Sequence, residues 1–326
     1  MVVRWESSRL LTATRRESPC IPMVVIGALK VGGSGKTSMT MALAQKAIKE
    51  GLNVAILTYR IGGKGERRTK KNLDEVMPGA TWRETSDEAC MLRQLSGARV
   101  FSTRNRAQAW QELQDPEVFG KHPFDLILSD DGFQDPRLQN AFRILLMGTE
   151  ENPRFRDLLP GGRFRETEAG QQRADLILRG PSARKSDKKN AKTEFQNANA
   201  QFQFLRMLQF PEKFQIGLPC VAVCALGNPQ GFFADLASGG VELKSTYCGL
   251  NHRGFVKRDI ERFLGQYPEH DILCTRKDWV KLKEQDIVPP RLVVVDQQLD
   301  FSPVVWNSIE QYRNSFRGVK EGNLVH

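Results

Sequence analysis

The chain has 326 residues, of which 40% are hydrophobic and 26% charged, and its formal net charge is +10. This composition excludes a disordered or fibrous protein, and the length allows either two domains or one large α/β domain with a well-buried core. The sequence has no run of about eighteen apolar residues, so we expect no membrane-spanning helix.

The cysteines and the N-terminal segment predict a cytoplasmic protein. Six cysteines are scattered without a C-x-x-C motif or a Cys/His cluster, which is typical of reduced, buried thiols. The first eleven residues are too short and too charged a stretch for a secretory signal. The positive charge favours an acidic partner, either nucleic acid, an anionic membrane surface or a phosphorylated substrate. Without aromatic and basic residues interleaved, or a zinc pattern, we expect no nucleic acid.

Apolar runs alternate with helical segments from about residue 22 to residue 180, which predicts a doubly wound, mainly parallel sheet of the α/β class. The turn after the first strand reads Gly-Gly-Ser-Gly-Lys-Thr at residues 32–37, so this sheet is predicted to be P-loop NTPase-like. The predicted strands are residues 24–26, 54–58, 100–102, 126–129, 144–147 and 176–178. A basic polar stretch near 181–200 predicts a linker. Strand patterns resume at 201–208, 220–224, 272–275 and 292–295. We therefore predict a P-loop core domain over residues 1–200 and a smaller α/β domain over residues 201–326 that closes over the active site.

A glycine-rich turn ending in Gly-Lys-Thr separates the first strand from a helix. Its residues are Lys30, Val31, Gly32, Gly33, Ser34, Gly35, Lys36 and Thr37. In such a loop, glycines let backbone N–H groups converge on phosphate oxygens, the lysine adds a mobile positive charge, and the threonine hydroxyl is placed to ligate Mg²⁺. The usual pattern has glycine where this chain has Lys30, but Gly32 and Gly33 restore the freedom of the backbone. We predict that this loop binds a nucleoside triphosphate.

The strand at 126–129 ends in two carboxylates, Asp130 and Asp131. Ligands of open α/β sheets bind outside the carboxyl ends of strands, so beside a phosphate loop these residues are predicted to hold or orient Mg²⁺. The other interpretation is a strand followed by a simple Asp-Gly turn. Further along, Arg163 and Arg165 could neutralise phosphate charge.

The segment around Asp87 has two interpretations. On spacing alone, residues 85–89 are a helix-capping turn, because Ser or Asp before acidic first-turn residues is a common cap. Histidines are scarce, and a lone histidine such as His252 is usually structural or exposed. The residues themselves therefore leave the roles of Asp87 and His252 open.

Taken in order, these elements resemble the tetraacyldisaccharide 4′-kinases of lipid A biosynthesis. The matching segments are residues 26–37, 58–63, 87–88, 130–134, 159–166, 227–229 with 232–233, 252 and 275–281. Their order and spacing make the match specific, although each is weak alone apart from the phosphate loop. The chain has Asp135 and Asn251 where that family usually has His and Asp.

The resemblance implies phosphoryl transfer from Mg·ATP to the 4′-hydroxyl of a tetraacylated glucosamine disaccharide 1-phosphate. ATP and Mg²⁺ are the implied cofactors. The implied partners are this lipid and an anionic membrane surface, with no obligate protein partner. The implied location is cytoplasmic, peripheral at the inner face of the bacterial inner membrane.

The resemblance also implies roles for individual residues. Asp87 is similar to the family's candidate base, with His252 from the second domain as its orienting partner. A base is needed because a sugar hydroxyl is a weak nucleophile. The side chains implied to stabilise phosphoryl charge are Lys36 and Arg165, and those implied to surround the metal are Thr37, Asp130, Asp131 and Glu166.

Two other functions use a phosphate loop. A regulatory P-loop NTPase is one, because residues 272–278 are superficially similar to a guanine-reading Asn-Lys-x-Asp element. However, Arg276 replaces the lysine of that element, and Val31 occupies the position of the extra lysine in partitioning ATPases. A kinase of a soluble sugar or cofactor is the other. Nucleotide preference and the identity of the phosphorylated product separate these alternatives from a lipid kinase.

Overall fold

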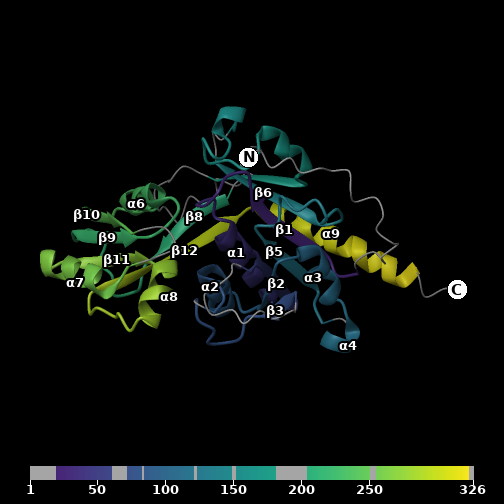
Figure 1. The fold of residues 1–326 in the computed structure, drawn as a ribbon, viewed down its shortest axis with the longest axis horizontal. Helices are drawn as coiled ribbons and strands as arrows, with labels where there is room; N and C mark the ends of the chain where they lie inside the picture. Colours follow the sequence, from purple (N-terminus) through teal and green to yellow (C-terminus); the bar gives the residue numbers. More distant parts are fainter. Residues whose placement is uncertain are drawn as a thin grey trace.

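The protein is built on two β-sheets with helices on their faces (Figure 1). The computed structural model describes residues 20–60, 72–82, 84–120, 123–148, 152–180, 204–249 and 255–322. The first sheet has seven strands in the order β3-β4-β2-β5-β1-β6-β7, and the second has five in the order β10-β9-β11-β12-β8. All neighbouring strands are parallel except β3 with β4 and β8 with β12. The predicted α/β fold class is therefore confirmed.

The strands of the first sheet are β1 (Met23–Ala28), β2 (Val54–Tyr59), β3 (Leu73–Glu75), β4 (Arg99–Thr103), β5 (Leu126–Asp130), β6 (Phe142–Gly148) and β7 (Leu176–Gly180). The helices between them are α1 (Lys36–Lys49), α2 (Asp87–Leu95), α3 (Arg106–Glu112), α4 (Pro116–Phe119) and the 3₁₀ turns η1 (Phe155–Asp157) and η2 (Glu168–Arg173).

The strands of the second sheet are β8 (Phe204–Gln209), β9 (Cys220–Cys224), β10 (Leu243–Cys248), β11 (Asp271–Thr275) and β12 (Leu292–Phe301). Its helices and the final helix are α6 (Pro229–Ser238), α7 (Lys257–Gln266), α8 (Arg276–Glu284) and α9 (Pro303–Gly322). Every predicted strand is present. The unpredicted strands β3 and β10 are a three-residue antiparallel edge strand and a half-buried edge strand. Such strands carry weak hydrophobic patterns.

Strand β1 lies inside the first sheet, and all six of its residues are buried. Its alternate side chains enter two separate cores, as the period of two in a strand requires. Val24 and Ile26 pack with α1, α2 and α9, whereas Met23 and Val25 pack with α3 on the other face. Helices on both faces of a parallel sheet explain why the strand is a continuous apolar run.

Helix α9 follows the second sheet in the chain but packs against the first (Figure 1). Trp306 and Ile309 lie in the same core as α1, and the Tyr312 hydroxyl donates to the carbonyl of Asn140 at 2.7 Å. The antiparallel strands β8 and β12 connect the sheets, since Phe204 and Leu299 also enter this core. The predicted domain limits stay a prediction, and the predicted linker at 181–200 lies outside the described residues.

Gly27 of β1 holds the turn after β5 close to the sheet. A Cβ atom at this position would lie 2.1 Å from the Cβ of Phe133. We expect Gly27→Ala to lower the free energy of unfolding by about 1–3 kcal/mol, because overpacking displaces the backbone of that turn. Urea denaturation measures the change. Gly265→Ala in α7 is the control, since a Cβ there meets no atom within 4 Å, and equal midpoints for the two variants would contradict the prediction.

Candidate active site

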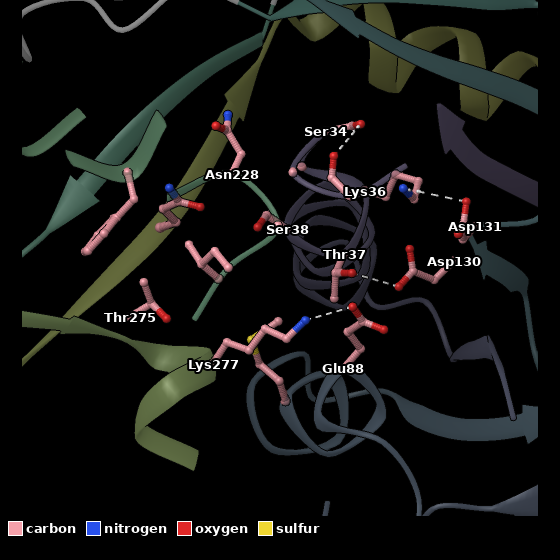
Figure 2. A pocket seen from close by; sticks show the side chains of 18 of the residues that line it. Ser34, Lys36, Thr37, Ser38, Glu88, Asp130, Asp131, Asn228, Thr275 and Lys277 are labelled. Atoms are coloured by element: carbon pink, nitrogen blue, oxygen red, sulfur yellow. Dashed lines mark hydrogen bonds and ion pairs between the residues drawn. The ribbon is translucent and has the colours of Figure 1, made fainter. Parts of the chain in front are cut away.

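A cavity of about 570 Å³ is lined by loops of both sheets (Figure 2). The phosphate loop at residues 31–37, Glu88 and Asp130 line it from the first sheet. Asn228, after β9, and Lys277, in the first turn of α8, line it from the second. The cavity lies beyond the carboxyl ends of β1 and β5, the edge where an open α/β sheet binds its ligands.

The phosphate loop has the backbone that its glycines predict. Gly32, Gly33 and Gly35 have φ angles of 70°, 67° and 83°, in the left-handed region that favours glycine. Gly35 is the N-cap of α1 and provides no side-chain hydrogen bond, so the first N–H groups of this helix are directed at the cavity edge without a capping side chain. This arrangement is suited to an anion.

The segment that carries Arg165 is held against the phosphate loop by backbone hydrogen bonds. The Val31 amide donates to the Arg163 carbonyl at 2.9 Å, and the Arg165 amide donates to the Leu29 carbonyl at 2.7 Å. Two predicted phosphate-binding segments that are more than a hundred residues apart in the chain are therefore neighbours in the fold.

Asp130 and Thr37 form the core of the predicted metal site. The Thr37 hydroxyl donates to Oδ2 of Asp130 at 3.0 Å (Figure 2). Burial, together with the negative charges of Glu88 and Asp131, raises the pKa of Asp130 to about 7. Because the protein concentrates negative charge here, these oxygens fit a divalent cation. Among the described residues, no group of three or more His, Cys, Asp or Glu side chains is arranged to hold a metal ion.

Asp131 forms ion pairs with both cations that are predicted to stabilise phosphoryl charge, Lys36 and Arg165. Both terminal nitrogens of Arg165 donate to its carboxylate at 2.7 Å, and Nζ of Lys36 lies 3.7 Å from Oδ1. Burial alone would raise the pKa of Asp131, but the hydrogen bonds from Arg165 and the charges of Lys36, Arg165 and Arg106 hold it below its usual value. Asp131 is thus an ionised carboxylate that orients Lys36 and Arg165 at the cavity.

Other predicted residues lie apart from this group. Glu166 pairs with Arg173 at 2.5 Å and is absent from the cavity wall formed by the described residues. Asp135 accepts two hydrogen bonds from Arg137 at 2.8 Å and is likewise absent from that wall. Although Asp135 is partly buried, these bonds lower its pKa. His252, Asn251 and residues 61–63 lie outside the described part of the chain.

Asp87 is the first residue of α2, and Ser86 is the capping residue whose hydroxyl accepts from the Ala89 amide at 3.1 Å. Oδ2 of Asp87 lies 2.8 Å from Nζ of Lys281 and 3.3 Å from Nζ of Lys277. Burial opposes ionisation, but the two lysines lower the pKa of Asp87. The Asp87 side chain is buried next to the cavity, and its half-buried neighbour Glu88 lines the cavity.

Charged residues of the second sheet that were not predicted from the sequence also face the cavity. Arg276 and Asp296 form an ion pair there, and Arg206 pairs with Asp235 at 3.0 Å. Lys277 was part of a matching segment but had no predicted role. The position of Lys277 in the sequence could have indicated a role. A cation in the first turn of a helix interacts unfavourably with the helix dipole, which implies that carboxylates lie nearby.

Comparison with known proteins decides the family. The family described as tetraacyldisaccharide-1-P 4′-kinase (LpxK) matches residues 1–313. The chain belongs to this family. The tetraacyldisaccharide 4′-kinase of Haemophilus influenzae (strain 86-028NP) is 28% identical over 305 residues, covering 90% of this chain and 86% of the relative. The Chlamydia trachomatis serovar D enzyme is 29% identical over 274 residues, covering 80% of this chain and 72% of its own.

A solved LpxK structure has the same fold. The "apo" form of Aquifex aeolicus LpxK in complex with ATP aligns with a TM-score of 0.60 at 22% identity, covering 91% of this chain and 88% of that one. The LpxK family predicted from the order of the motifs is therefore confirmed. In the described part of the chain, no helix is both long and apolar enough to cross a bilayer.

Proposed function

We propose that this LpxK-family chain transfers the γ-phosphoryl group of ATP to the 4′-hydroxyl of tetraacyldisaccharide 1-phosphate in lipid A biosynthesis. The observation that carries the proposal is the family match over residues 1–313. It does not favour a regulatory P-loop NTPase or a kinase of a soluble sugar. The ATP complex of the Aquifex aeolicus relative supports ATP as the donor.

The phosphate loop and its cations perform the phosphate half of the reaction. Backbone N–H groups at residues 32–36 bind the phosphate oxygens, and Lys36 and Arg165 stabilise the charge on the transferred group. Thr37 and Asp130 would hold Mg²⁺, with Asp131 as a further carboxylate beside them, whereas Glu166 pairs with Arg173 away from the cavity wall formed by the described residues. The ion supplies charge neutralisation at the phosphate oxygens. Phosphoryl transfer depends mainly on such positioning and electrostatics.

Asp87 is the proposed general base. The sugar hydroxyl loses its proton as the new P–O bond forms, and an ionised carboxylate within reach accepts it. The pKa of Asp87, lowered by Lys277 and Lys281 against the effect of burial, ensures that the carboxylate is ionised at neutral pH. His252 is the proposed orienting partner of this carboxylate.

The decisive test is a direct kinase assay. The full chain is incubated with Mg·ATP and tetraacyldisaccharide 1-phosphate, and the bisphosphorylated lipid is detected by mass spectrometry. GTP and a soluble glucosamine acceptor are run in parallel. Turnover of the soluble sugar without turnover of the lipid would overturn the proposal, and a preference for GTP would favour the regulatory alternative.

We further infer that the protein attaches peripherally to an anionic membrane through the loop around η1. Phe155 is 84% exposed and Leu159 is 54% exposed, and the intervening Arg156 side chain is 79% exposed. Leu159 also lines the cavity beside the phosphate loop. Apolar side chains flanked by cations are suited to the interface of an anionic bilayer. This surface would bring the cavity to the lipid substrate.

Phe155→Asp is expected to weaken binding to vesicles of phosphatidylglycerol and phosphatidylcholine by about tenfold or more, because it replaces a ring that would insert into the bilayer with a carboxylate that the anionic lipids repel. Vesicle co-sedimentation measures the binding. Val118→Asp in α4, where Val118 is 67% exposed, is the matched control and keeps wild-type binding. Wild-type binding by Phe155→Asp would exclude this loop as the membrane contact. Activity on detergent-dispersed lipid should be unchanged in both variants.

A further inference from the structure

Four charged side chains join helices α2 and α8 next to the cavity. We call Asp87, Glu88, Lys277 and Lys281 the α2–α8 charge cluster. Nζ of Lys277 lies 2.9 Å from Glu88 and 3.3 Å from Asp87, and Nζ of Lys281 lies 2.8 Å from Asp87. Helix α2 leads into β4 of the first sheet, and α8 connects β11 and β12 of the second. The cluster therefore forms ion pairs between the parts of the cavity wall that the two sheets provide.

The two lysines occupy different environments. The Lys281 side chain is 1% exposed, and it contacts Asp87 beneath the cavity wall. A buried ammonium group needs an ionised partner, because it has lost its hydration. Lys277 instead lines the cavity and pairs with Glu88 (Figure 2). Its Nζ also lies 3.3 Å from Oδ2 of Asp87. Lys281 therefore connects the two helices in the protein interior, whereas Lys277 contacts the carboxylates of α2 at the cavity surface.

The backbone around Lys277 is firmly anchored. Thr275 is the N-cap of α8, and its hydroxyl and the Asp278 carboxylate are hydrogen-bonded at 2.7 Å. The same carboxylate accepts from the Ala225 amide at 3.2 Å, which ties the start of α8 to the end of β9. The Lys277 side chain therefore projects from an anchored first turn of α8. The helix dipole disfavours a cation at this position, and the two carboxylates of α2 offset this unfavourable interaction.

We propose that Lys277 is a positioning residue that holds the Asp87 carboxylate in place for proton transfer, with Glu88 as the second anchor of the lysine. The proposal rests on the proposed function, in which Asp87 is the base. Oδ1 of Asp87 accepts only the Glu88 amide among the hydrogen bonds described, at 3.1 Å, whereas Oδ2 is contacted by both lysines. Lys277 therefore fixes the orientation of the carboxylate through one oxygen and leaves the other to receive the proton.

The charges around Asp87 agree with this role. Burial raises its pKa, and Lys277 and then Lys281 lower it below the ordinary value. The described titratable groups that interact with Asp87 are its neighbour Glu88 and Cys90 on α2, and Lys277 and Lys281 on α8; Glu84 and Glu284 act on the same Cys90 thiol. Lys277 and Lys281 are the cations among these described groups, so removing Lys277 takes away one of the charges that lower the pKa of Asp87, and that pKa rises.

Three methionine variants of the full chain separate the roles. Lys277→Met is expected to move the acid limb of the kcat/KM profile to higher pH and to lower kcat about ten- to a hundredfold, with little change in the KM for ATP. Lys277→Arg restores the acid limb. Lys281→Met is expected to lower the melting temperature more than Lys277→Met does. Lys283→Met, at an exposed position of α8, controls for the loss of one charge on this helix.

A titration of the Asp87 carboxyl carbon by NMR tests the proposal without turnover. We expect its pKa to rise in Lys277→Met and to stay at the wild-type value in Lys283→Met. An unchanged pKa or an unchanged acid limb in Lys277→Met overturns the positioning role. So does a loss of melting temperature in Lys277→Met that matches the loss in Lys281→Met, since that indicates a structural role. Failure of the wild-type chain to phosphorylate the lipid overturns the proposed function instead.

Discussion

Lys36→Ala is expected to lower kcat by about a hundred- to a thousandfold while the protein stays folded. Lys36 is the first residue of α1 and lines the cavity at the end of the phosphate loop. In the proposed function its charge stabilises the negative charge that develops on the transferred phosphoryl group, and removal of one such preorganised donor typically costs this much. Steady-state kinetics with the lipid acceptor measure the loss.

A second lysine on the same helix is the control for Lys36→Ala. Lys46 is half-exposed and pairs with Glu50 within α1, so Lys46→Ala removes the same charge from the same helix away from the cavity. Its kcat should equal that of the wild type. Thermal unfolding of both variants checks that the helix is intact. Wild-type kinetics for Lys36→Ala would contradict the assignment of the phosphate loop to catalysis.

Asp87→Asn and Asp87→Ala are expected to lower turnover by about a hundredfold or more, as loss of a general base does. ATP binding should persist, because the proposed nucleotide contacts come from the phosphate loop, whereas Asp87 is proposed to act on the lipid hydroxyl. Calorimetric titration with ATP and single-turnover assays with the lipid separate the two effects. A variant with near-wild-type turnover would reduce Asp87 to a structural partner of the lysines.

The Asp87 variants also have a stability effect that must be separated from catalysis. They remove the ionised carboxylate that the buried Lys281 contacts, and loss of one member of a buried ion pair costs about 3–5 kcal/mol. The double variant Asp87→Asn with Lys281→Met should recover stability but not turnover. Recovery of both would show that the activity loss came from misfolding.

The lowered pKa of Asp87 determines how its contribution to the free energy of unfolding changes with pH. Because the folded-state pKa lies below the unfolded value, the ion pair contributes its full stability above the ordinary aspartate pKa. This contribution is lost as the pH falls through the lowered pKa. The difference in stability between the wild type and Asp87→Asn should therefore shrink towards acidic pH.

Local patterns predicted most of the secondary structure because the information lies within each segment. The buried strands β1, β2, β5 and β9 are continuous apolar runs, and the phosphate loop needs glycines at fixed offsets to adopt left-handed φ angles. Edge strands β3 and β10 were missed because their half-buried side chains have no strong periodicity. The packing of α9 against the first sheet depends on surfaces far away in the chain, so no local pattern indicates it.

The sequence by itself determined the α/β class, the phosphate loop and the order of motifs that marks the LpxK family. Only the tertiary structure decided which charges meet. It pairs Arg165 with Asp131, and it brings Lys277 to Glu88 across 189 positions of the chain. It also separates Glu166 from the cavity wall and places Asp87 against Lys281. The physical reason is that contacts between distant elements depend on strand order and on how two sheets are packed together, and neither is encoded in local periodicity.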